Sequence, residues 1–71
     1  MYKHYYVNTD SSTNPNNNHE VHTEDCIWLP SASKRKYLGY YSDCADAVRK
    51  AKLYYINVDG CATCCPKCHR G

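Results

Sequence analysis

The stretch GCATCCPKCH, residues 60–69, holds four of the six cysteines of the chain within eight positions, and a histidine follows the last of them. Cys61 and Cys64 form one C-x-x-C pair, and Cys65 and Cys68 form a second. Cysteines in such a cluster share a metal ion, pair in disulfides or act as reactive thiols. Each of the first two roles would tie the C-terminal end of the chain to residues elsewhere in the fold.

Such cross-links matter because the chain has only 71 residues and few aliphatic side chains. A domain of this size buries about 60% of the surface that its unfolded form exposes, so an apolar core alone stabilises it marginally. There is no phenylalanine, and eight tyrosines supply much of the apolar bulk. We therefore expect one small domain, residues 1–71, that depends on its cysteines for stability.

Two segments rich in aromatic residues predict short strands. They are residues 2–8 (YKHYYVN) and residues 37–42 (YLGYYS), where Gly39 marks a bend or bulge. Residues 19–26 alternate weakly around Val21 and are expected to pair with the first strand as a hairpin.

The segments that connect these strands differ in polarity. Residues 9–18 consist of turn formers and predict a polar, mobile loop. Residues 26–30, CIWLP, are the most apolar run and predict core positions for Trp28 and Leu29.

One helix is predicted at about residues 43–55, with Ser42 or Asp43 capping its first turn. Gly60 is expected to be a turn residue beyond its end. An apolar stripe runs along one face of this helix and comprises Cys44, Ala47, Val48, Ala51 and Tyr55. The fold class is therefore α+β: a small antiparallel sheet of two or three short strands, one packed helix and a C-terminal cysteine knuckle.

Zinc binding explains the cysteine cluster best. Zinc takes four tetrahedral ligands from Cys and His, often as two close pairs from different parts of the chain. His22 and Cys26, three residues apart, offer the upstream half. The preferred ligands of a single structural zinc ion are Cys26, Cys61, Cys64 and Cys68, with Cys65 and His22 as substitutes.

Two alternatives remain open. Six cysteines allow fifteen disulfide pairings, and Cys44 on the helix stripe could bridge to Cys61 or remain a packed thiol. A thiol-based redox or catalytic role is the weaker alternative, because a thioredoxin-type C-x-x-C begins a helix, whereas these pairs follow one. A nucleophilic cysteine could still use His19, His22 or His69, although so short a chain leaves little wall for a substrate pocket.

Nine basic and seven acidic residues are too balanced to argue for nucleic acid. The one basic run, Lys34 to Lys36, is better explained as a solvated loop, although it leaves nucleic acid as a possible partner. The N-terminal residues do not resemble a signal peptide, and no segment has the length and apolarity of a membrane span. We expect a cytoplasmic monomer that binds an unidentified protein partner and no membrane.

The order VHTEDC, YLGYYSDCADAVRKAK and DGCATCCPKCH resembles a family of small uncharacterised bacterial proteins over most of residues 19–69. That resemblance implies a compact α/β domain of unknown function.

The chain is also distantly similar to the zinc-binding domain of Ada-type DNA methylphosphotriester repair proteins. That family pairs an upstream C-x3-C with a C-x2-C that follows a helix and a glycine. His22 and Cys26 match the first pair, and either Cys61/Cys64 or Cys65/Cys68 matches the second. The likeness implies a four-ligand zinc site. It does not imply repair activity, because histidine replaces the methyl-accepting cysteine and the DNA-binding helix-turn-helix is missing.

Overall fold

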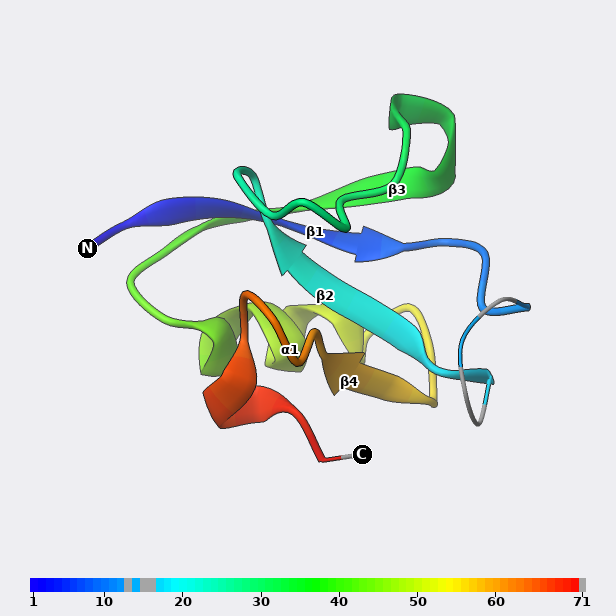
Figure 1. The fold of residues 1–71 in the computed structure, drawn as a ribbon. Helices are drawn as coiled ribbons and strands as arrows, with labels where there is room; N and C mark the ends of the chain where they lie inside the picture. Colours follow the sequence, from blue (N-terminus) through cyan, green and yellow to red (C-terminus); the bar gives the residue numbers. More distant parts are fainter. Residues whose placement is uncertain (13, 15–16, 71) are drawn as a thin grey trace.

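The computed structural model describes residues 1–12, 14 and 17–70, and this part of the chain forms one four-stranded sheet with one α-helix (Figure 1). The α+β class predicted from the sequence is confirmed, but the sheet is larger than the predicted two or three strands. It is also mixed rather than antiparallel. Its strands, in the spatial order β3-β1-β2-β4, are β1 (Lys3–Asn8), β2 (His19–Thr23), β3 (Arg35–Tyr41) and β4 (Val58–Gly60).

Strands β1 and β2 form the expected antiparallel hairpin, with Tyr6 opposite His22 and Val7 opposite Val21. Because side chains alternate between the faces of a strand, Val7 and Val21 share one face while Tyr6 and His22 share the other. Both valines are fully buried. The loop predicted to be mobile, residues 9–18, contains residues 13 and 15–16, which lie outside the described residues.

Strand β3 pairs antiparallel with β1 and contains the predicted irregularity at Gly39. Gly39 lies opposite Tyr5 and Tyr37 lies opposite Tyr6, so Leu38 is the extra residue of a bulge. Gly39 has a φ of +138°, and a Cβ there would lie 2.6 Å from the Tyr41 hydroxyl oxygen. The backbone conformation therefore favours glycine, and a larger residue would also have to displace the Tyr41 ring.

Strand β4 runs parallel to β2, with Val21 opposite Gly60. This strand is not predictable from the sequence, because three residues are too few for a periodic pattern, and Gly60 is typical of a turn. A Cβ on Gly60 would lie 2.6 Å from the Cβ of Cys68. The absence of a side chain lets the C-terminal segment cross directly over β4.

Helix α1 (Cys44–Ala51) is shorter than the predicted helix at about residues 43–55. Asp43 caps it as expected, accepting hydrogen bonds from the amides of Ala45 and Asp46. After Ala51 the chain tightens into turns, in which the Tyr54 amide donates to the Ala51 carbonyl.

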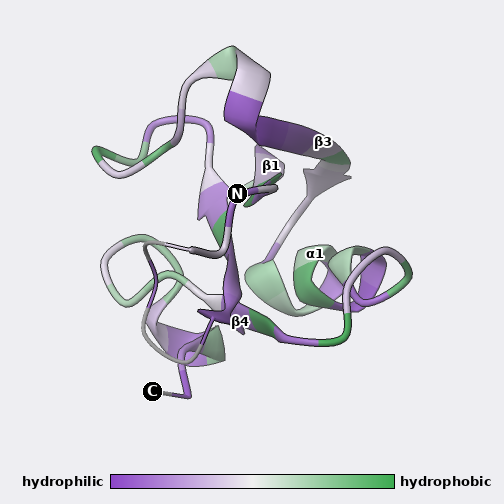
Figure 2. Cartoon of the chain, turned by 90° about the vertical axis from the view of Figure 1, so that its right-hand side faces the viewer, coloured by the Kyte–Doolittle hydropathy of each residue, from purple (hydrophilic) through white to green (hydrophobic). Residues whose placement is uncertain are grey.

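The predicted stripe on α1 packs against the sheet. Hydrophobic and hydrophilic segments alternate around the helix in Figure 2, as expected for an element with one buried face. The core comprises side chains from α1, from the inner face of the sheet and from the C-terminal cysteines: Tyr5, Val7, Val21, Leu38, Cys44, Ala47, Ala51 and Cys65.

The prediction that Trp28 is a core residue is wrong, since its side chain is 63% exposed; its neighbour Leu29 is half-buried. The segment after β2 turns back over the face of the sheet opposite α1 (Figure 1). There the Trp28 indole N–H donates to the Thr63 hydroxyl at 3.2 Å. The apolar run therefore lies across the outer face and does not enter the core.

Short 3-10 helices also lie before β3 and near the C-terminus of the described residues. They are η2 (Ala32–Lys34) and η3 (Pro66–Cys68). No helix in the described part of the chain has the length and apolarity needed to cross a membrane.

Candidate metal centre

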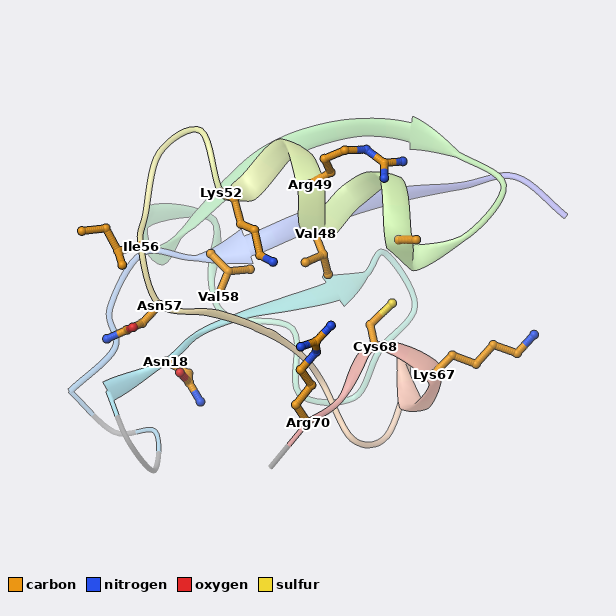
Figure 3. A pocket seen from close by; sticks show the side chains of 11 residues that line it. Asn18, Val48, Arg49, Lys52, Ile56, Asn57, Val58, Lys67, Cys68 and Arg70 are labelled. Atoms are coloured by element: carbon orange, nitrogen blue, oxygen red, sulfur yellow. The ribbon is translucent and has the colours of Figure 1, made fainter.

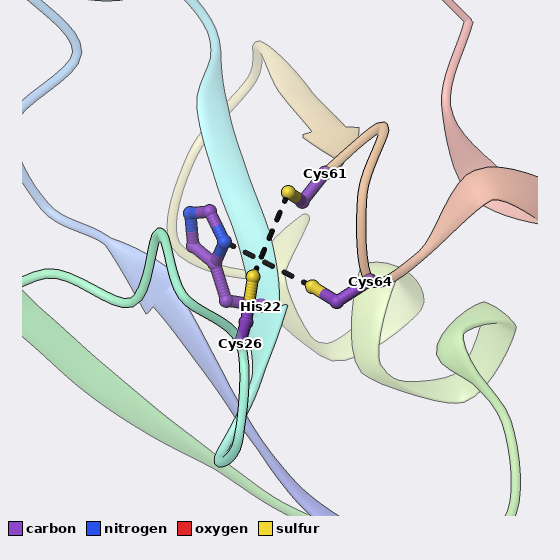
Figure 4. A group of neighbouring side chains, drawn as sticks. All are labelled: His22, Cys26, Cys61 and Cys64. Carbon is purple, nitrogen blue, oxygen red and sulfur yellow. Dashed lines mark hydrogen bonds between the residues drawn. The ribbon is translucent and has the colours of Figure 1, made fainter.

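Four side chains from separate parts of the chain converge at the C-terminal end of β2, beside the residues that follow β4 (Figure 4). They are His22, Cys26, Cys61 and Cys64, and their ligand atoms all lie within 4.8 Å of one another. His22 and Cys61 are buried, while Cys26 and Cys64 are partly exposed.

The register of the parallel strands brings His22 and Cys61 together. Continuing the pairing of Val21 with Gly60 by one residue places His22 beside Cys61. The Cys61 amide donates to the Val21 carbonyl at 3.0 Å, which holds this register beyond the end of β4. Neighbouring residues on paired strands point to the same face, so the imidazole and the thiol meet.

Two tight turns supply the other two ligands. The Cys26 amide donates to the Thr23 carbonyl at 3.2 Å, and the Cys65 amide donates to the Cys61 carbonyl at 2.8 Å. The first turn brings Cys26 back toward β2, and the second places Cys64 on the same side as Cys61.

The spacing of the ligand atoms suits a tetrahedral ion. The Sγ atoms of Cys26 and Cys61 are 3.9 Å apart, and Cys64 Sγ lies 3.9 Å from His22 Nδ1. Zinc–sulfur bonds of about 2.3 Å in tetrahedral geometry would separate two sulfurs by about 3.8 Å. A disulfide, in contrast, requires sulfurs about 2.05 Å apart.

Backbone amides point at two of the sulfurs. The Thr23 amide donates to Cys64 Sγ and the Trp28 amide donates to Cys26 Sγ, each at 3.4 Å. Such donors stabilise the thiolate form that binds a metal.

The second nitrogen of His22 faces a carboxylate. Nδ1 points into the cluster, and Nε2 lies 3.7 Å from Oε1 of Glu20. Burial raises the pKa of Glu20, and the nearby Asp59 carboxylate raises it further. A carboxylate behind the outer nitrogen is the usual arrangement for a metal-bound histidine, because it fixes the ring orientation. Residues two positions apart on a strand lie on the same face, so the sequence could have indicated Glu20 as a neighbour of His22.

Without a cation the cluster favours protonated thiols. Burial raises the pKa of the Cys26 thiol to about 12. A hydrogen bond with the Cys65 thiol, together with burial, raises the pKa of Cys64. A divalent cation at the centre would reverse this preference, because a coordinated thiol loses its proton.

Two of the six predicted ligands lie elsewhere. Cys68, one of the four preferred, is joined to Cys44 in a disulfide, and His22 completes the cluster instead. The suggested bridge from Cys44 to Cys61 is therefore wrong. Cys65 points into the core, where it is 2% exposed, although its Sγ lies 3.8 Å from that of Cys64. Of the two adjacent cysteines, only Cys64 directs its sulfur at His22, Cys26 and Cys61.

His69 and the basic run also lie away from the cluster. The Nδ1 atom of His69 is 3.0 Å from the Gly60 carbonyl oxygen and 3.4 Å from an Asp59 carboxylate oxygen. In the basic run, Arg35 lies over the Tyr6 ring and Lys36 lies over the Tyr54 ring.

No protein-family model, curated protein or solved structure matches the chain. The resemblances to small bacterial proteins and to the Ada-type zinc domain stay predictions. The geometry of the cluster therefore carries the functional argument alone.

Proposed function

We propose that this chain is a small zinc-binding domain in which His22, Cys26, Cys61 and Cys64 hold one structural zinc ion. The observation that carries the proposal is the convergence of three sulfurs and one imidazole nitrogen within 4.8 Å of one another. A Cys3His set is typical of structural zinc sites, and soft thiolate ligands favour zinc over magnesium or calcium.

The same ligand set argues for a structural role. Catalytic zinc sites keep a position open for water or substrate, whereas four protein ligands fill the tetrahedral shell. The four residues also connect β2, the turn after it and the segment after β4. We therefore propose a binding or adaptor module, whose metal holds its surface in shape, rather than an enzyme.

Intact mass spectrometry under native conditions, without reducing agent, tests the proposal. We expect one zinc ion per chain, released by a chelator, and the Cys44–Cys68 disulfide retained. Cys26→Ser should abolish stoichiometric zinc, whereas Cys65→Ala should retain it. A metal-free chain that shows a further disulfide between Cys26 and Cys61 would overturn the proposal.

The affinity for zinc should fall as the pH falls. Cysteine binds zinc as the thiolate, so protons compete with the metal for each sulfur, and the raised pKa of Cys26 in the metal-free chain strengthens this competition. Titration with a competing chelator at several pH values measures the effect. An affinity that does not change with pH would contradict coordination by thiolates.

A further inference from the structure

A second feature lies on the other side of the C-terminal segment. A cleft of about 630 Å³ opens between α1, β4 and the residues around η3 (Figure 3). Four of the nine basic residues of the chain line it, and none of the seven acidic residues does: Arg49, Lys52, Lys67 and Arg70. None of the four ligands of the metal centre lines the cleft, so it is a separate site.

Two of these cations converge. In Figure 3 the side chains of Lys52, from the end of α1, and Arg70, from the C-terminal segment, point toward one another. Val48 and Val58, which also line the cleft, lie on either side of the end of the Lys52 side chain in this view (Figure 3). Among the described residues, neither Lys52 nor Arg70 forms an ion pair, whereas Arg49 pairs with Asp46. Two like charges that face one cleft, with no acidic residue among those that line it, create a positive potential that attracts an anion.

The fold holds the two sides of the cleft together. The Cys44–Cys68 disulfide joins the start of α1 to η3, two residues before Arg70. The Arg70 amide donates to the buried Asp59 carboxylate at 2.8 Å, which fixes the backbone of Arg70 against β4. Folding therefore brings the positive side chains of Lys52 and Arg70 together. The free-energy cost of their mutual repulsion is included in the free energy of folding, so a bound anion does not have to supply it.

We propose that this cleft binds the phosphate group of a small phosphorylated ligand. Lysine and arginine together suit a phosphate, since the ammonium supplies a compact charge and the guanidinium a planar pair of donors. Val48 and Val58, which line the cleft beside Lys52 (Figure 3), would contact an apolar part of the ligand next to the phosphate. The backbone of a nucleic acid also carries phosphate groups. The test below distinguishes a small phosphorylated ligand from a nucleic acid.

Titration of the disulfide-intact, zinc-replete chain with inorganic pyrophosphate at low salt, followed by amide chemical shifts, tests the proposal. We expect saturable shifts that centre on Lys52, Val58 and Arg70. The double variant Lys52→Gln/Arg70→Gln should weaken binding about a hundredfold, since each of the two lost charge-assisted hydrogen bonds is worth about tenfold. Lys34→Gln/Lys36→Gln removes the same charge elsewhere and should leave the affinity within about twofold.

Three results would overturn the proposal. Pyrophosphate could fail to saturate the shifts, or the two double variants could weaken binding equally, which would indicate diffuse attraction only. A single-stranded oligonucleotide could bind more tightly than pyrophosphate and depend equally on both pairs of cations, which would assign the phosphate chemistry to a nucleic acid. The spectrum of each variant checks its fold, and Lys52→Gln alone replaces the double variant if that variant is unfolded.

Discussion

The two groups of cysteines hold the same C-terminal segment in opposite ways. Cys44 and Cys68 join α1 to η3 by a covalent bond at the edge of the core, where Cys44 is buried and Cys68 is partly buried. The Sγ atoms of Cys26 and Cys61 approach only to 3.9 Å, beside the His22 imidazole and with an amide donating to Cys26. Spacing along the chain does not distinguish these cases, since Cys61–Cys64 and Cys65–Cys68 are both C-x-x-C pairs. The face to which each cysteine points decides its partner.

Removal of the metal should be the largest perturbation. Structural zinc supplies about 10–16 kcal/mol of binding free energy in small zinc-binding peptides, more than the whole stability of a domain of this size. Chelation, or Cys61→Ser, should therefore abolish cooperative thermal unfolding. Circular dichroism during heating measures this, with Cys65→Ala as the control that keeps the transition. An unchanged melting temperature after complete chelation would show that the cluster does not stabilise the fold.

Loss of the disulfide should cost less. The bridge closes a loop with a sequence separation of 24, for which chain entropy predicts about 3.5 kcal/mol of stabilisation. Cys44→Ser/Cys68→Ser should lower the free energy of unfolding by about that amount while zinc stays bound at one ion per chain. Urea denaturation of the zinc-bound chains measures the difference. Loss of zinc from this variant would mean that the two cross-links form one cooperative unit.

The sequence predicted the parts of the fold that have a repeating pattern or a local signal. The hairpin of β1 and β2, the bulge at Gly39 and the Asp43 cap each depend on neighbouring residues, and all are confirmed. Strand β4 was missed because its pairing with β2 depends on residues nearly 40 positions away. Trp28 was misplaced because an apolar run does not show which face of the sheet it covers.

The ligands of the candidate site divide in the same way, into those that a local pattern predicts and those that depend on distant parts of the chain. The upstream pair, His22 and Cys26, and the downstream cluster were recognisable from their spacing. The choice among Cys64, Cys65 and Cys68 was not, because it depends on the turn after β4 and on the position of Cys44 on α1. Cys68 is not a ligand because the apolar stripe of α1 holds Cys44 beside the C-terminal segment, where the two cysteines form a disulfide.

The C-terminal segment crosses closely over Gly60 of β4, between the metal centre and the disulfide. A substitution at Gly60 tests whether this close contact is needed for stability. A Cβ at this position would lie 2.6 Å from the Cβ of Cys68 and 3.0 Å from the Cys65 carbonyl oxygen. Gly60→Ala must therefore displace backbone on one side, and such overpacking typically costs about 1–3 kcal/mol. We expect a lower urea midpoint with both the zinc and the disulfide retained. A midpoint equal to that of the unaltered chain would show that η3 moves away without cost.

The smallest expected effect concerns Glu20, which lies beside the metal centre and not beside the disulfide. Its carboxylate lies 3.7 Å from His22 Nε2, so it can orient the ring and make the other nitrogen a better ligand. Glu20→Gln should weaken zinc binding about tenfold, the lower end of the range for such outer partners, and leave the disulfide unaffected. Competition with a chelator of known affinity measures the change. Glu24→Gln is the matched control, because the Glu24 carboxylate accepts a hydrogen bond from the His4 amide instead. Equal zinc affinities in the two variants would show that the ring of His22 is held by β2 and the cysteines alone, and that the carboxylate behind it contributes nothing to the metal centre.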